Sequence, residues 1–164
     1  MSNVSGKPIA LAITGASGAP YALRLLQSLV EAERQVYLMV SKAAQVVMPM
    51  ETDLSLPSRA SEAEILLTEH FNAAPGQIRV FGREQWTAPV ASGSNPPQAM
   101  VVGPGSTGTL SAIACGASNN LIERAADGVL KDQRKLILNV RESPCPPRHP
   151  QHLASLARMG WGTL

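Results

Sequence analysis

The sequence has 164 residues, the size of one domain, with 45% hydrophobic and only 16% charged residues. This composition excludes a wholly disordered chain, and a formal net charge of +2 lacks the basic excess of a dedicated nucleic-acid-binding protein. The longest apolar runs, such as residues 9–13, fall well short of the roughly 18 residues that a membrane-spanning helix needs. We therefore expect one cytoplasmic domain over residues 1–164 without a membrane span, and the low charge favours a homo-oligomer that buries surface between subunits.

The first forty residues predict a βαβ unit. The apolar run 9–13 stops at the small-residue turn 14–18, and leucines at helical spacing follow as far as Val30. Residues 35–40 are rich in β-branched and apolar side chains and predict a second strand. Such a crossover is right-handed and makes the two strands parallel.

The middle of the chain continues the alternation of helices and strands. Ser41 can cap a helix over residues 43–47, and Ser61 with Glu64 three residues later predicts a capping box for a helix that ends near His70. Residues 78–81 predict a strand. Proline and glycine residues then predict a loop over residues 87–98.

The last predicted elements repeat the arrangement of strand, glycine turn and helix. They are a strand at 99–102, a turn at 103–109, helices at 110–117 and 121–130, and a strand at 135–140. This order predicts an α/β fold with a doubly wound parallel sheet between two helical layers. Ligands of such sheets bind at the carboxyl ends of the strands, where both glycine turns lie.

The turn at 14–18 predicts an anion site, because backbone N–H groups and the positive end of a helix attract a phosphate. The dinucleotide fingerprint G-x-G-x-x-G is absent, as is a Walker motif. A glycine turn that only packs a helix on a strand is the alternative. Hydroxyls at Ser106, Thr107 and Thr109 in the second turn favour a phosphorylated ligand.

Several other residues allow both a structural and a functional interpretation. Residues 119–127 are either a helix cap with surface ion pairs or part of a site, and Arg141 with Glu142 is either a strand-end salt bridge or an acid/base pair. Trp86 either anchors the core or stacks on a ligand. The histidines at 149 and 152 lack a third ligand, so we expect no metal, and both cysteines are expected to be free thiols.

Taken together, these motifs resemble the UbiX family of flavin prenyltransferases, formerly described as aromatic-acid carboxy-lyases. The resemblance spans residues 9–144. It rests on Thr14-Gly-Ala-Ser-Gly18, Ser41-Lys-Ala-Ala44, Glu51-Thr-Asp53, Trp86, Ala91-Ser-Gly-Ser94, Ser106-Thr-Gly-Thr-Leu-Ser111, Asn119-Asn-Leu-Ile-Glu-Arg124 and Arg141-Glu-Ser-Pro144. Each motif is weak alone, and the ordered set is specific.

The resemblance implies a Rossmann-like, flavodoxin-like fold in a homo-oligomer, typically a dodecamer, that binds FMN at subunit interfaces. It implies transfer of a dimethylallyl group from dimethylallyl monophosphate to N5 and C6 of reduced FMN, without a metal. The prenylated FMN would then serve a UbiD-type decarboxylase in ubiquinone precursor or aromatic-acid metabolism.

The resemblance also assigns roles to individual residues. Positions that match FMN-binding residues are Gly15, Ala16, Ser17, Ser41, Ser92, Ser106, Thr109 and Arg124. Trp86 matches the aromatic residue of the prenyl site, while Lys131, Arg141 and Glu51 match groups near the dimethylallyl phosphate. Glu142 and Ser17 are the residues that we expect to handle protons.

The chain departs from the family pattern after Pro144 and stops at Leu164, where the family continues through another strand and a final helix. We therefore expect a flavin-binding domain that lacks this C-terminal segment. Two alternatives follow from the residues and the resemblance: a subunit that binds FMN but is catalytically impaired, and an enzyme that decarboxylates aromatic acids directly.

Overall fold

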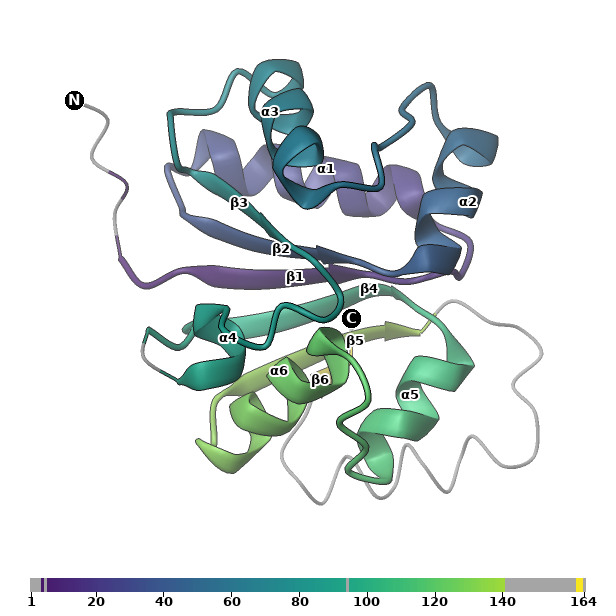
Figure 1. Cartoon of the computed structure of the whole chain (residues 1–164), viewed down its shortest axis with the longest axis vertical. Helices are drawn as coiled ribbons and strands as arrows, with labels where there is room; N and C mark the ends of the chain where they lie inside the picture. The colour runs from purple at the N-terminus through teal and green to yellow at the C-terminus, as the bar shows by residue number, and fades with distance from the viewer. Residues whose placement is uncertain (1–3, 5, 94, 141–161, 164) are drawn as a thin grey trace.

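The computed structural model describes residues 4, 6–93, 95–140 and 162–163 and contains one parallel sheet (Figure 1). The sheet has six strands in the order β3-β2-β1-β4-β5-β6, and every neighbouring pair is parallel. The strands are β1 (Ile9–Ile13), β2 (Val36–Val40), β3 (Ile78–Phe81), β4 (Ala99–Gly105), β5 (Lys135–Val140) and β6 (Gly162–Thr163). The predicted α/β class and doubly wound parallel sheet are confirmed.

Helices cover both faces of the sheet and complete the three layers. One face carries α1 (Ala19–Glu31), α2 (Lys42–Glu51) and α3 (Ala60–His70), and the other carries α4 (Pro89–Ser92), α5 (Thr107–Ala114) and α6 (Leu121–Lys131) (Figure 1). In β1, Leu11 and Ile13 pack toward the first layer, whereas Ala10 and Ala12 pack toward the second. This period of two follows from the pleat of a strand that is buried on both sides.

The topology changes direction between β1 and β4. The chain first builds outward from β1 to β2 and β3, and then returns to the other side of β1 to build β4 and β5. A crevice for ligands lies outside the carboxyl ends of the strands at such a switch point. The first predicted glycine turn follows β1. The predicted bounds of the second turn, 103–109, are wrong, because residues 103–105 extend β4 and residues 107–109 begin α5, so that Ser106 alone separates strand and helix; this strand-to-helix junction is called the second turn below.

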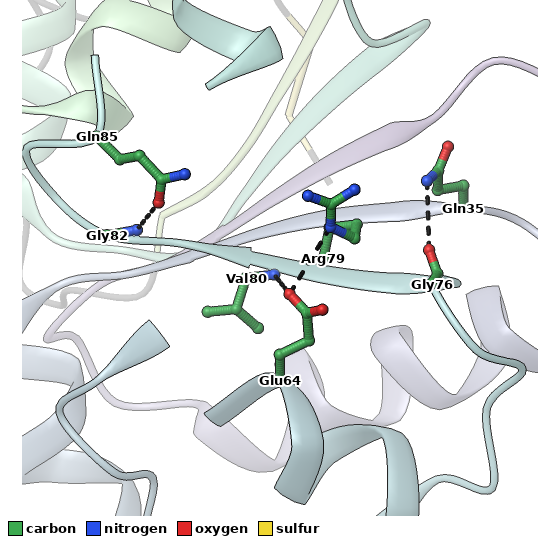
Figure 2. Close-up of polar contacts among 7 residues, drawn as sticks. All are labelled: Gln35, Glu64, Gly76, Arg79, Val80, Gly82 and Gln85. Carbon is green, nitrogen blue, oxygen red and sulfur yellow. Dashed lines mark hydrogen bonds and ion pairs between the residues drawn. The ribbon is translucent and has the colours of Figure 1, made fainter. Parts of the chain in front are cut away.

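The predicted capping box of Ser61 and Glu64 is wrong. The helix α3 begins at Ala60 with Arg59 as its N-cap residue, and no side chain caps it. Glu64 instead reaches the outer edge of β3, where its Oε2 accepts a hydrogen bond of 2.8 Å from the N–H of Val80 (Figure 2). Among the described strands none pairs with this edge of β3 to take the donor, so satisfying it outweighs a local cap.

The predicted loop at 87–98 contains the short helix α4. Pro89 occupies its first turn, where the fixed φ angle of proline suits a helix and its missing N–H costs nothing, and Gly93 ends the helix with φ of 71°. Likewise α5 begins at Thr107, earlier than predicted, because the side chain of Ser106 caps it. Proline and serine are both unfavourable inside a helix, and here Pro89 and Ser106 stand at the start of one.

Candidate functional site

The carboxyl ends of β2, β1 and β4 are tied to one another by backbone hydrogen bonds. The N–H of Ser41 donates to the carbonyl of Ile13 at 2.9 Å, and the N–H of Thr14 donates to the carbonyl of Pro104 at 3.2 Å. The structure thus brings together the start of α2 and both small-residue turns at the switch point of the sheet. Seven of the predicted site residues lie in these segments or next to them: Gly15, Ala16, Ser17, Ser41, Glu51, Ser106 and Thr109.

The first turn combines tight packing with unused backbone donors. A Cβ atom at Gly15 would lie only 2.5 Å from Cβ of Ala43 in α2, so the close approach of the two segments requires glycine. The N–H groups of Gly15, Ala16 and Ser17 have no hydrogen-bond partner in the described part of the chain, and Ser17 is exposed. The packing interpretation and the anion-binding interpretation therefore both apply to this turn.

A carboxylate of the same chain occupies the N-terminus of α1. Oε2 of Glu51, the last residue of α2, accepts hydrogen bonds of 2.9 Å from the N–H groups of Gly18 and Ala19. An anion therefore does lie at this helix end, as the helix dipole predicts, and that anion is Glu51. A phosphate at this edge would have to use the preceding donors at residues 15–17.

The hydroxyls that follow β2 and β4 are helix caps. Ser41 accepts a hydrogen bond of 3.1 Å from the N–H of Ala44, and Ser106 accepts one of 3.3 Å from the N–H of Thr109. The hydroxyl of Ser106 also donates to that of Thr109 at 3.0 Å. Because a hydroxyl carries one hydrogen and two acceptor positions, Ser41 and Thr109 each keep a hydrogen that can be donated to a phosphate.

Sequence reasoning assigned no role to Thr14, which the structure places between the two turns. Its side chain is 2% exposed. The hydroxyl donates to the carbonyl of Pro104 at 2.6 Å and accepts from the N–H of Ser106 at 2.8 Å. A polar residue directly after an apolar strand and before a glycine is the signal that could have identified it.

Trp86 does not anchor the core. It lies in the segment between β3 and α4 and is 47% exposed, in a chain whose aromatic content is only 4%. A half-exposed indole ring leaves a face available to a ligand or to another subunit. The second interpretation from the sequence, stacking on a ligand, is the one that this exposure favours.

Three further predicted site residues lie in a different part of the structure. Ser92, Arg124 and Lys131 line a pocket of about 170 Å³ between α4 and α6, two helices that lie side by side in Figure 1. Lys131 ends α6 only four positions before β5 begins, so it lies toward the amino ends of the strands, opposite the two turns. Its Nζ is 3.0 Å from Oδ2 of Asp127.

The start of α6 has the structural role that one interpretation of residues 119–127 predicted. Oδ1 of Asn120 accepts from the N–H of Glu123 at 2.9 Å, and the buried carboxylate of Glu123 accepts from the N–H of Asn119 at 2.7 Å. This reciprocal cap fixes the first turn of α6, on which Arg124 is exposed. Capping and site positioning are therefore compatible functions of one motif.

Some predicted features lie outside the described residues: Arg141, Glu142, Cys145, His149 and His152. Cys115 is a free and exposed thiol, as predicted. Within residues 4, 6–93, 95–140 and 162–163, no cluster of three or more His, Cys, Asp or Glu side chains could hold a metal. Across the same ranges, none of the helices is long and apolar enough to cross a bilayer.

Comparisons with known proteins agree with the resemblance. Residues 1–161 match the family described as Flavoprotein. The chain is 56% identical over 152 residues to the flavin prenyltransferase UbiX of Pseudomonas aeruginosa, covering 93% of this chain and 73% of that protein. It is 39% identical over 160 residues to the flavin prenyltransferase UbiX of Alkalihalophilus pseudofirmus, covering 98% and 78%.

Solved structures of similar sequence have the same fold. A crystal structure of AnUbiX in complex with FMN and dimethylallyl pyrophosphate has a TM-score of 0.82 at 32% identity, covering 97% of this chain and 77% of that one. A dodecameric FMN-dependent UbiX-like decarboxylase from Escherichia coli O157:H7 has a TM-score of 0.81 at 34% identity, covering 95% and 77%. With a matching architecture and these identities, the chain belongs to the flavoprotein family and, within it, to the UbiX flavin prenyltransferases.

Proposed function

We propose that this protein is a cytoplasmic flavin prenyltransferase that transfers a dimethylallyl group from dimethylallyl monophosphate to N5 and C6 of reduced FMN. One observation carries the proposal. In a chain 56% identical to a flavin prenyltransferase, three adjacent strand ends bring backbone donors and hydroxyls together at the switch point of the sheet. The product, prenylated FMN, would be used by a UbiD-type decarboxylase.

The donor set at these strand ends fits the phosphate of FMN. The N–H groups of Gly15, Ala16 and Ser17 and the hydroxyls of Ser41 and Thr109 are all hydrogen-bond donors, as a phosphate dianion requires. The carboxylate of Glu51 would remain on the N-terminus of α1 beside them. When bound, reduced FMN supplies the two ring atoms that accept the prenyl group.

The proposed reaction needs groups that stabilise opposite charges. Positive charge develops on the allylic carbon as the phosphate leaves, and the half-exposed indole of Trp86 could stabilise it through its π-electrons without forming a bond. Lys131 and Arg141 would stabilise the departing phosphate, and Glu51 would come near them from a neighbouring subunit. Ser17 and Glu142 would hold and move protons. The resemblance alone supports the roles of Arg141 and Glu142, which lie outside the described residues.

The separation of the two groups of predicted residues supports a site shared between subunits. Ser92, Arg124 and Lys131 line the pocket between α4 and α6, and no residue of the two turns is among the residues that line it. A second copy of the chain could place its α4–α6 pocket beside the turns of the first. We propose this arrangement within a homo-oligomer, which the dodecameric UbiX-like relative supports.

The direct test is product formation. Purified protein is incubated anaerobically with reduced FMN and either dimethylallyl monophosphate or dimethylallyl pyrophosphate, and the flavin is analysed by mass spectrometry. Prenylated FMN from the monophosphate supports the proposal, and product from the pyrophosphate alone would reject the proposed donor. Protein that binds FMN without forming product is the impaired subunit. Release of carbon dioxide from an aromatic acid without a partner enzyme identifies a direct decarboxylase.

Mixed oligomers test the shared site. One variant carries Ser106→Ala and Thr109→Val, and the other carries Arg124→Ala, so each is defective in a different cluster. If each site combines the clusters of two subunits, co-expression of both variants restores about a quarter of the wild-type activity, because that share of interfaces pairs two intact clusters. Absence of any recovery in correctly assembled mixed oligomers would contradict a shared site.

A further inference from the structure

We propose that Thr14 is a positioning residue for FMN, and that its hydroxyl holds the second turn in register with the first. The inference rests on the proposed function, because it assumes that both turns bind the phosphate of one ligand. Thr14 itself is buried and would not touch the ligand. It would act through Ser106 and Thr109.

The side chain of Thr14 continues the pairing of β1 and β4 beyond its last backbone register pair, Ala12 with Val102. The single hydroxyl group serves as donor to the carbonyl of Pro104 at 2.6 Å and as acceptor from the N–H of Ser106 at 2.8 Å. The hydroxyl oxygen of Thr14 is therefore hydrogen-bonded to two residues that lie 90 and 92 positions later in the sequence. Both are short, well-formed hydrogen bonds.

The end of β4 pairs irregularly: its register with β1 ends at Val102, and it rejoins β5 only through Gly105 and Val140. Pro104 has no N–H to donate to a neighbouring strand. On its other side β4 pairs with β5, and there the register shifts between Val102 and Gly105. The bond from Ser106 to Thr14 thus holds the chain at the point where it leaves the sheet and enters α5.

When the backbone of Ser106 is held in place, the hydroxyl groups of Ser106 and Thr109 are held in place as well. The Ser106 hydroxyl caps α5 and donates to Thr109 at 3.0 Å, which directs the remaining hydrogen of Thr109 away from Ser106. Thr14 immediately precedes Gly15, so the same residue holds the first set of phosphate donors. Without the hydroxyl, the backbone bond of 3.2 Å from the N–H of Thr14 to the carbonyl of Pro104 still joins the two turns, but Ser106 is no longer held. The distance between the two donor sets is then less well fixed, and binding of one phosphate by both becomes weaker.

Two near-isosteric variants separate the hydroxyl from the rest of the side chain. Thr14→Val keeps the shape and removes both hydrogen bonds, whereas Thr14→Ser keeps the hydroxyl and removes the methyl group. FMN affinity is measured by titration of flavin fluorescence. We expect Thr14→Val to raise the Kd for FMN by roughly tenfold, which corresponds to the loss of one hydrogen bond between FMN and the displaced second turn. Thr14→Ser should stay within about twofold of the wild-type Kd. KM for FMN should rise with Kd, while kcat changes less.

A general loss of stability must be distinguished from lost positioning. Ile78→Val removes one methylene from a fully buried position in β3, at the edge of the sheet, and destabilises the fold without touching either turn. If its Tm falls by about as much as that of Thr14→Val, this control should still bind FMN with the wild-type Kd. Equal weakening in Ile78→Val and Thr14→Val would overturn the proposal, as would an unchanged Kd in Thr14→Val.

Hydrogen exchange in the wild-type protein provides a test that does not depend on the folding of a variant. The amide of Ser106 should exchange slowly, because Thr14 holds it. Exchange at the rate of an unstructured amide would overturn the proposal. Failure of the proposed function would look different: wild-type protein with a protected Ser106 amide would not bind FMN at all.

Discussion

Oε2 of Glu51 lies 2.9 Å from the backbone nitrogen of Gly18, so the end of α2 supplies the carboxylate that satisfies the start of α1. The same oxygen accepts from Ala19. Two helices that cover one face of the sheet are thereby joined at the edge where the ligand site is proposed. This contact also determines which donors of the first turn remain for a phosphate.

Replacing Glu51 should expose an anion site. In Glu51→Ala the N–H groups of Gly18 and Ala19 lose their acceptor, so the free energy of unfolding should fall by about 1–2 kcal/mol. Sulfate should then raise Tm more in the variant than in wild type, measured against chloride at equal ionic strength. Asp53→Ala, at an exposed position close by, is the control and should respond as wild type does. Equal sulfate responses in Glu51→Ala and wild type would contradict the prediction.

A methyl group at Gly15 should push the first turn away from α2. The added Cβ would meet Ala43 at 2.5 Å, and such overpacking costs about 1–3 kcal/mol of stability. Chemical denaturation measures this loss, and FMN affinity should fall as well. Removing the opposing methyl in the double variant Gly15→Ala, Ala43→Gly should recover part of both. A double variant whose losses simply add would argue against the steric explanation.

Glu64 should protect the free edge of β3 through a hydrogen bond more than through its charge. The ion pair with Arg79 spans 3.8 Å between side chains that are 31% and 49% exposed, so it contributes little (Figure 2). Glu64→Gln retains an acceptor oxygen for the N–H of Val80 and should cost well under 1 kcal/mol. Glu64→Ala should cost about 1–2 kcal/mol and increase aggregation on heating, measured by light scattering. Arg79→Gln is the control for the charge, and a loss as large as that of Glu64→Ala would reverse this assignment.

The cap of α6 should affect both stability and the position of Arg124. Asn120→Ala removes the acceptor for the N–H of Glu123 and should lower the free energy of unfolding by about 1 kcal/mol. Asn119→Ala is a matched control, because Asn119 contributes its backbone N–H to the cap and that group survives the substitution. Thermal unfolding of both variants checks the difference. Equal Tm values for the two would show that the side chain of Asn120 does not cap the helix.

Local patterns were sufficient to predict the order and type of most elements. The apolar run 9–13, the small residues after it and the leucine spacing that follows predict β1, a turn and α1, because strand pleating and helix periodicity depend on neighbouring residues. The position of Ser41 likewise predicts a helix cap, which its bond with the N–H of Ala44 confirms. Local reading failed where a residue had two possible uses, as with Pro89 at the start of α4.

The composition, the alternation of strands and helices and the small-residue turns already contain the fold class and the edge of the sheet where a phosphate would bind, because each depends on short stretches of chain. The sequence does not show that Glu64 turns to β3, that Glu51 occupies the start of α1 or that Thr14 joins two turns 90 residues apart. The Thr14 contact forms because β4 pairs beside β1, whereas the Glu64 contact forms where α3 packs against β3 and the Glu51 contact where the end of α2 meets the start of α1. The packing of elements therefore decides which polar groups are satisfied within the chain and which remain for a ligand.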